Sequence, residues 1–150
     1  MKKIASFTVD HTKLDPGIYV SRVDGDVTTY DLRMKKPNAG EYLSDLQMHS
    51  FEHLLATFMR NGKIAENVIY VGPMGCRTGF YLLVRDLSCD AVLDALIEAL
   101  EDICTYVGEM PGASEKECGN YRELSLDAGR DVAAQYLFIL KSKKNDFKYR

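Results

Sequence analysis

The sequence predicts an α+β fold built as a single domain over residues 1–150. Two observations lead to this prediction: four short stretches rich in β-branched and aromatic residues, and three longer stretches whose apolar residues recur at helical spacing. No internal repeat or long linker divides the chain, and a chain of 150 residues can bury a substantial core. We therefore expect two strand hairpins packed against helices.

The first hairpin is predicted from residues 18–23 and 27–34. Both stretches are rich in β-branched and aromatic residues, which favour strands. Asp24-Gly25-Asp26 separates them, and a glycine between two aspartates is typical of a tight turn. Arg33 falls at the far end of the second strand, where its guanidinium can pair with an oxygen atom of a substrate.

One helix is predicted over residues 44–62. Ser44 and Gln47 have the spacing of a capping box, in which each side chain bonds to a backbone N–H of the other residue. Asn61-Gly62 provides an end, because both residue types tolerate the left-handed conformation that closes helices. The apolar face that should anchor the helix comprises Met48, Phe51, Leu55 and Phe58.

The opposite face of this helix carries a candidate metal site. His49 and His53 are four residues apart, so their imidazoles stand one above the other and can share one ion. Glu52 borders the same face, within reach of anything bound there. A buried imidazole pair without a ligand would carry a desolvation cost, and this cost favours a metal site over a purely structural role.

The second hairpin is predicted from residues 67–71 and 79–85. Between them, residues 72–79 contain three glycines and a proline, a composition typical of a shaped turn. Cys76 lies in this turn beside Arg77, and a thiol next to a cation can act as a base or nucleophile. The alternative for Cys76 is a small buried hydrophobe. The turn lacks the Gly-Lys-Ser/Thr ending of a phosphate-binding loop.

Two further helices are predicted in the second half of the chain. Residues 90–107 place apolar side chains on one stripe, and another helix starts at about Asp127. The charged stretch 141–146 is expected to be a solvated, frayed terminus. The first stripe comprises Leu93, Leu96, Ile97, Leu100, Ile103, Cys104 and Val107, and the second comprises Val132, Ala133, Tyr136, Leu137 and Leu140.

Composition and charge exclude several classes of protein. Apolar residues make up 46% of the chain and charged residues 27%, and a net charge of −3 provides no basic field for nucleic acid or an anionic membrane. No apolar run has the length of a signal-peptide core or a membrane span. We expect a cytoplasmic protein, in which the four cysteines are thiols or metal ligands rather than disulfides.

The histidine pair needs a third ligand, because a catalytic metal site usually has three protein ligands and one open position. Cys118 is the best candidate, since it lies in a polar, glycine-flanked stretch whereas Cys104 belongs to a core stripe. Zinc, ferrous iron and cobalt all suit such a site. Glu52 and Cys76 would then be two proton-transfer groups beside a Lewis acid, which suits proton movement on carbons next to a carbonyl.

In these motifs and in their order the chain resembles the S-ribosylhomocysteine lyase (LuxS) family, the enzymes that make the autoinducer precursor. The most specific run covers residues 72–81, whereas the histidine motif alone also occurs in unrelated peptidases. The other matching stretches are Ser6-Phe7 with Asp10-His11, Asp31-Leu32-Arg33 with Pro37-Asn38, His49-x-x-Glu52-His53-Leu54-Leu55-Ala56, and Glu117-Cys118-Gly119-Asn120.

The resemblance implies a reaction and an architecture. It implies cleavage of S-ribosylhomocysteine to homocysteine and dihydroxypentanedione. In that family a metal polarises the sugar carbonyl, proton transfers through enediolates move this carbonyl along the ribose, and β-elimination releases the homocysteine thiol. The resemblance also implies a four-stranded antiparallel sheet packed against helices, and a homodimer with the active sites at the subunit interface. The product would serve quorum sensing or methyl-cycle recycling.

The resemblance also implies roles for single residues, with ferrous iron as the metal and zinc or cobalt as substitutes. The matching residues are His49, His53 and Cys118 for the metal, Cys76 and Glu52 for acid–base catalysis, and Ser6, His11 and Arg33 for holding substrate. Tyr70 stands where many family members have an acidic residue, so a substrate hydrogen bond is lost there or made by the phenol.

Two other functions fit part of the pattern. His-x-x-Glu-His also marks inverted zinc peptidases, whose glutamate activates water and whose third ligand would here be Glu98 or Glu101. That alternative gives no role to Cys76 or Cys118. A metal-stabilised binding domain is the other alternative, but structural zinc sites are usually closed by four ligands, most often cysteines.

Overall fold

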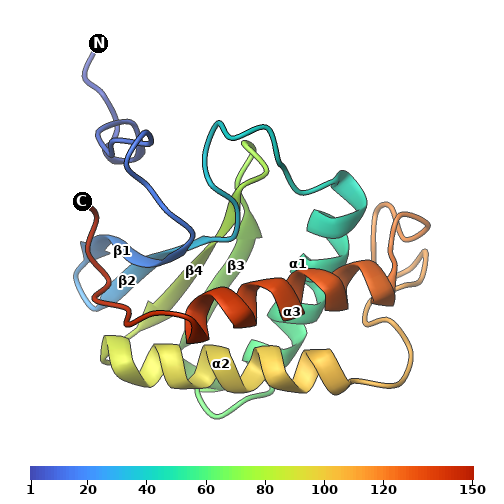
Figure 1. Cartoon of the computed structure of the whole chain (residues 1–150). Coiled ribbons are helices and arrows are strands. Elements are labelled where there is room, and N and C mark those ends of the chain that lie inside the picture. Colours follow the sequence, from blue (N-terminus) through green and yellow to red (C-terminus); the bar gives the residue numbers. More distant parts are fainter.

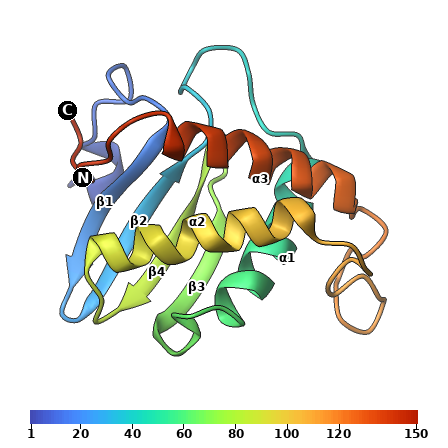
Figure 2. The same ribbon diagram turned by 60° about the horizontal axis from the view of Figure 1, so that its bottom comes forward.

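The computed structural model describes residues 1–150 and contains a four-stranded antiparallel sheet with three helices on one of its faces (Figures 1 and 2). The predicted α+β fold is therefore confirmed. The strands are β1 (Gly17–Asp24), β2 (Val27–Arg33), β3 (Val68–Pro73) and β4 (Gly79–Arg85). The helices are α1 (Asp45–Arg60), α2 (Cys89–Thr105) and α3 (Leu126–Lys141), with short 3-10 turns η1 (Ala5–Phe7) and η2 (Ala65–Asn67).

Both predicted hairpins form, and they join side by side in the strand order β1-β2-β4-β3. Each neighbouring pair is antiparallel, so Asp31 of β2 lies opposite Tyr19 of β1 and Tyr81 of β4. Side chains alternate along a strand. Tyr30 belongs to the core beneath the helices, and Asp31 and Arg33 therefore face the opposite, helix-free side of the sheet.

The capping box at the start of α1 is confirmed. The Ser44 hydroxyl accepts from the backbone N–H of Gln47, and the Gln47 side chain accepts from the N–H of Ser44. The apolar face is rotated from the predicted one, because α1 packs between α3 and β3. The fully buried apolar residues of α1 are Phe51, Leu54, Leu55 and Met59, whereas Met48 and Phe58 of the predicted face are only partly buried.

The second predicted helix is shorter than expected. α2 begins at Cys89 and ends at Thr105, where the next residue, Tyr106, turns to an extended conformation. The prediction that Val107 lies on the core stripe is therefore wrong, since this side chain is 89% exposed. Cys104 packs against the core but is only partly buried.

None of the helices combines the length and the apolar character needed to cross a bilayer.

The end of the chain does not fray as predicted. Residues 141–144 are exposed, but the chain then returns to β1, where Phe147 forms a parallel bridge with Tyr19. The Phe147 carbonyl accepts from the N–H of Val20 at 2.8 Å, and its ring packs edge-on against Tyr30. Figure 1 shows the C-terminus beside β1, far from the loop that joins α2 to α3.

Candidate active site

Two side chains of α1 and one from the loop between α2 and α3 meet in a cluster that can hold a metal ion. The ligand atoms of His49, His53 and Cys118 all lie within 4.8 Å of one another, and all three residues are half-buried. The Cys118 sulfur is 3.4 Å from Nε2 of His49 and accepts from the N–H of Asn120 at 3.4 Å. The structure thus brings the predicted third ligand to the histidine pair.

Backbone carbonyls of the same loop orient both imidazoles. Nδ1 of His49 lies 2.8 Å from the carbonyl oxygen of Glu123, and Nδ1 of His53 lies 2.8 Å from that of Pro111. A carbonyl only accepts, so each Nδ1 carries the hydrogen and each Nε2 keeps a free lone pair. Metal-binding histidines are commonly oriented by a hydrogen bond of this kind on their other ring nitrogen.

The loop approaches α1 closely because small residues lie at the contact. Gly112 has φ of +69°, and a β-carbon at this position would lie 2.9 Å from Nδ1 of His53. At the far end of the loop, the N–H of Ser125 donates to the buried hydroxyl of Ser50 on α1 at 2.8 Å. The loop is therefore held against the helix at two points, one before Cys118 in the sequence and one after it.

The cluster fits a divalent metal ion by the chemistry of its donors. Two imidazole nitrogens and one thiolate are typical ligands of zinc, cobalt and ferrous iron, and three protein ligands leave one position open. Two hollows of about 260 Å³ each flank the cluster, one lined by His49 and the other by His53. Glu52 lines both hollows, so it is the acidic side chain that they share.

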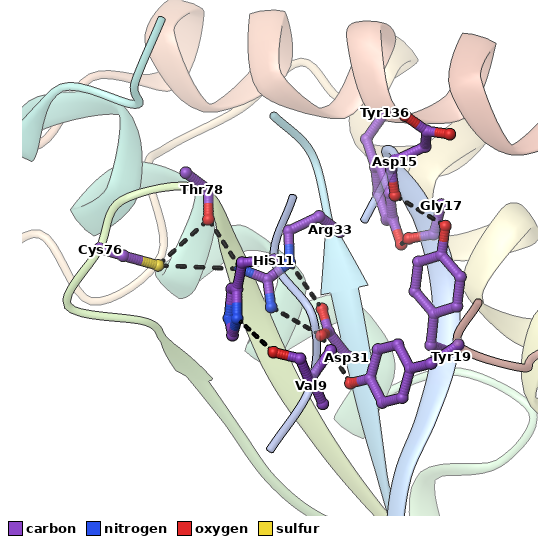
Figure 3. A network of polar contacts seen from close by, with 11 residues as sticks. Val9, His11, Asp15, Gly17, Tyr19, Asp31, Arg33, Cys76, Thr78 and Tyr136 are labelled. Carbon is purple, nitrogen blue, oxygen red and sulfur yellow. Dashed lines mark hydrogen bonds and ion pairs between the residues drawn. The ribbon is translucent and has the colours of Figure 1, made fainter. Parts of the chain in front are cut away.

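A second polar cluster lies on the helix-free face of the sheet, where β2 ends beside the β3–β4 turn (Figure 3). The Arg33 guanidinium donates to both carboxylate oxygens of Asp31, at 3.0 and 2.6 Å, and the two side chains are 3% and 2% exposed. Its Nη1 donates to the Thr78 hydroxyl at 2.8 Å and lies 3.8 Å from the Cys76 sulfur. Cys76 is exposed, which excludes a role as a buried hydrophobe.

Charge pairing decides the protonation state of this second cluster. Burial lowers the pKa of Arg33, but the hydrogen bonds and the charge of Asp31 outweigh burial, so the pKa is raised above its ordinary value. Burial and the nearby carboxylate of Asp31 also raise the pKa of Tyr81. The Cys76 sulfur therefore faces a permanent cation, and the phenol next to the ion pair is neutral.

The other predicted substrate-binding residues lie in the N-terminal segment and make no polar contact with either cluster. Ser6 is half-buried and lines a hollow of about 400 Å³ together with Tyr70, which is 55% exposed. His11 is half-buried, and its Nδ1 contacts the carbonyl oxygen of Val9 at 2.9 Å. Tyr70 and Ser6 thus share one hollow. The three candidate metal ligands are not among the residues that line it.

Sequence reasoning assigned no role to two members of the second cluster, Asp31 and Thr78. The pairing of Asp31 with Arg33 could have been predicted, because residues two apart in a strand share a face and Arg33 follows Asp31 by two residues. Thr78 follows Cys76 by two residues in a turn, where no fixed period predicts which side chains meet. Its contact with the sulfur, at 3.1 Å, comes from the turn geometry alone.

The carboxylates that the peptidase alternative requires lie elsewhere. Glu98 forms an ion pair with Lys63 at 3.0 Å, and Glu101 forms one with Lys141. Neither belongs to the group of ligand atoms around the two histidines. The side chains that the structure gathers as candidate ligands are therefore His-His-Cys, not His-His-carboxylate.

Comparison with known proteins covers nearly the whole chain. Residues 4–147 match the family model described as S-Ribosylhomocysteinase (LuxS). The S-ribosylhomocysteine lyase of Clostridium acetobutylicum is 49% identical, over 97% of this chain and 96% of the relative. Those of Borreliella burgdorferi (strain ZS7) and Finegoldia magna are 45% and 46% identical, over 99% and 97% of this chain and 99% and 96% of the relatives. By this match over nearly its whole length, the chain belongs to the S-ribosylhomocysteinase (LuxS) family.

Proposed function

We propose that the protein is a carbon–sulfur lyase that converts S-ribosylhomocysteine to homocysteine and dihydroxypentanedione, an autoinducer precursor. The observation that carries this proposal is the cluster of His49, His53 and Cys118, whose ligand atoms lie within 4.8 Å of one another. The chain around the cluster matches the LuxS family model over residues 4–147. A site with three protein ligands and an open position suits chemistry at a sugar carbonyl.

His49, His53 and Cys118 would hold the metal through two Nε2 atoms and one sulfur. When bound, the ion supplies a Lewis acid that polarises the carbonyl oxygen of the sugar. We propose ferrous iron as the native metal, with zinc or cobalt able to replace it, because imidazole and thiolate donors suit all three. Air should then erode the activity of the iron-loaded protein through oxidation of the metal and of cysteine.

Cys76 and Glu52 would move the protons. In each isomerisation step a base removes a proton from the carbon next to the carbonyl and an acid protonates the former carbonyl carbon, so the carbonyl moves by one position. In the last step, loss of a proton next to the carbonyl expels homocysteine from the following carbon as a thiol. Arg33, 3.8 Å from the Cys76 sulfur, can balance negative charge on that sulfur, and Glu52 lines both hollows beside the metal ligands.

Ser6, His11 and Arg33 would hold the substrate. The Arg33 guanidinium has one N–H beyond those directed at its three protein neighbours, and this N–H can meet a substrate oxygen. His11 uses Nδ1 on a backbone carbonyl, so Nε2 is available. The Ser6 hydroxyl lies at a hollow of about 400 Å³ that can accept part of a small molecule.

We propose a homodimer with the active sites at the interface. The hollow that Ser6 lines is bordered by apolar side chains that the single chain leaves uncovered: Ile4 is 58% exposed and Tyr70 is 55% exposed. Exposed apolar groups gathered at one place favour association, and a second copy on the helix-free face would cover them. Sedimentation of the purified protein tests the dimer.

We also propose that the protein works in the cytoplasm, where thiols such as Cys76 and Cys118 stay reduced. There, homocysteine can return to the methyl cycle, and the dihydroxypentanedione can supply a quorum-sensing signal.

A thiol reagent that detects homocysteine tests the function directly. The purified chain is supplied with S-ribosylhomocysteine, its metal content is measured on the same sample, and a parallel sample receives a peptide substrate. We expect homocysteine in proportion to bound metal and no peptide cleavage. A metal-loaded sample that cleaves peptides and releases no homocysteine would contradict the proposal and favour the peptidase.

A further inference from the structure

The C-terminal tail reaches the cluster around Cys76 through the phenol of Tyr149. The Tyr149 hydroxyl donates to Oδ2 of Asp31 at 2.7 Å, and its ring stacks on that of Tyr19 with centroids 5.1 Å apart. Tyr19 and Asp31 are cross-strand partners on the helix-free face of the sheet. One side chain of the tail therefore covers two neighbours on that face, and the reaction described above gives this contact no task.

The path of the tail aims Tyr149 at Asp31. Phe147 is held on the core side of the sheet, where it is 9% exposed and packs edge-on against Tyr30. Its φ is +63°, a strained value for a residue with a β-carbon. In a regular strand, residues two apart share a face, but this turn sends Tyr149 to the opposite face from Phe147. The tail is thus built to cross the edge of the sheet.

The Asp31 carboxylate has three donors and little access to water. Oδ1 accepts from Nε of Arg33, and Oδ2 accepts from Nη2 of Arg33 and from Tyr149. Asp31 is 1% exposed, so a lost donor would leave a buried negative charge partly uncompensated. Burial and the charge of Asp31 raise the pKa of Tyr149, so the phenol keeps its hydrogen and donates.

The orientation of Arg33 depends in turn on Asp31. Paired contacts with a carboxylate fix the plane of a guanidinium. In this plane, Nη1 points to the Thr78 hydroxyl at 2.8 Å and to the Cys76 sulfur at 3.8 Å. Loss of the donor to Oδ2 would let the carboxylate turn, or would leave more negative charge beside Arg33. Both changes weaken the positive field at the Cys76 sulfur.

We propose that Tyr149 is a positioning residue of the active site. By donating to Asp31 it keeps Arg33 in the orientation that presents positive charge to Cys76, and the C-terminal tail thereby becomes part of the proton-transfer apparatus. This inference rests on the proposed function only in so far as Cys76 transfers protons.

The variant Tyr149→Phe removes the hydroxyl and keeps the ring that stacks on Tyr19. The first measurement is the rate at which iodoacetamide alkylates Cys76 in the full-length, metal-loaded protein, followed by mass spectrometry of the peptide that contains Cys76. We expect this rate to fall by roughly threefold to tenfold, because the reacting species is the thiolate. The second is homocysteine release, in which kcat/KM should fall by at least a similar factor.

Tyr19→Phe is the matched control. It removes a phenol hydroxyl from the same stacked pair, one that donates to the Asp15 carbonyl at 2.7 Å and makes no contact with Asp31. We expect wild-type alkylation of Cys76 in this variant. A second test variant lacks residues 148–150 but keeps Phe147, and it should slow alkylation at least as much as Tyr149→Phe.

A wild-type alkylation rate in Tyr149→Phe would overturn the inference, even if turnover fell. An equal slowing in Tyr19→Phe would also overturn it, because it would reveal only a general loosening of the tail. Slower alkylation confined to the Tyr149 variants, in a protein that releases no homocysteine, would support the positioning role and contradict the proposed lyase function. The two failures are thus distinguishable.

Discussion

The two clusters that carry the proposed chemistry are held in opposite ways. In the metal cluster, His49 and His53 stand on α1, but Cys118 and the carbonyls that orient both rings belong to the loop between α2 and α3. In the cluster around Cys76, the ion pair of Asp31 and Arg33 stands on one strand and is almost fully buried. One cluster joins a helix to a loop, whereas the charged pair of the other lies within one strand of the sheet.

This difference concerns what each cluster needs in order to stay formed. A bound ion would itself tie the loop to α1, so metal binding and local order should be coupled there. The buried ion pair is closed by protein groups, so it should keep its geometry without metal. We therefore expect metal removal to loosen the loop that carries Cys118 and to leave the ion pair of Asp31 and Arg33 in place.

The largest expected effect comes from His53→Ala, which breaks the metal cluster. Two donors bind a divalent ion far more weakly than three, so we expect the purified variant to hold almost no metal and to release no detectable homocysteine. Elemental analysis measures the metal. His11→Ala is the control for metal content, because this histidine lies outside the cluster. Wild-type metal content in His53→Ala would contradict the ligand assignment.

Cys76→Ala tests the second cluster without touching the metal ligands. We expect metal content to be unchanged and kcat to fall by about 10²- to 10⁴-fold, the usual contribution of one acid–base group. Cys89→Ala, at the start of α2, should keep the wild-type rate. Metal loss in the Cys76 variant would mean that the two clusters are not separable, and undiminished turnover would remove Cys76 from the mechanism.

Asp31→Ala tests how much the buried ion pair of the second cluster contributes to the free energy of unfolding. It leaves the Arg33 guanidinium buried and unpaired, which should lower the free energy of unfolding by about 3–5 kcal/mol. Asp24→Ala is the matched control, since Arg22 and Asp24 form the same kind of pair on β1 but are 57% and 52% exposed. Its effect should be much smaller.

Urea unfolding of these two variants, with and without a chelator, provides the measurement. The effect of Asp31→Ala should be the same in both conditions, because changes at independent sites add. A destabilisation that disappears when the metal is removed would show that the sheet cluster depends on the ion.

The smallest effect is expected from Gly112→Ala in the loop. The new β-carbon would lie 2.9 Å from Nδ1 of His53 in a backbone conformation with φ of +69°, so the carbonyl that orients this ring must shift. Loss of such an orienting hydrogen bond typically weakens metal affinity by about 10- to 100-fold. Competition with a coloured chelator measures the affinity. Gly119→Ala, in the same loop, meets nothing within 4 Å and should bind metal as the wild type does.

Local features of the fold were predictable because their signals are local. Residues 79–85 were predicted as a strand and form β4 with those bounds, and the Ser44–Gln47 capping box formed as expected. Boundaries shifted where tertiary pairing extends an element. β3 continues to Pro73 because its last residues pair with β4, as far as Pro73 opposite Phe80.

In the candidate site, too, the contacts within one helix or strand were predictable, whereas most contacts between elements were not. The helical period places His49 above His53, and strand alternation places Asp31 beside Arg33. The partners of these residues follow no period. The carbonyls that orient the two imidazoles belong to Glu123 and Pro111. These residues follow His49 and His53 by 74 and 58 positions in the chain.

By itself, the sequence determined the α+β class, the histidine pair and the turn that contains Cys76, because each is encoded within a few neighbouring residues. Only the tertiary structure decided which loop carbonyls orient the two imidazoles and that the chain end returns to the ion pair behind Cys76. Tyr149 and Asp31 are 118 residues apart. A contact over that separation depends on the packing of β1, α3 and the tail together, and such packing leaves no periodic signal in a single sequence.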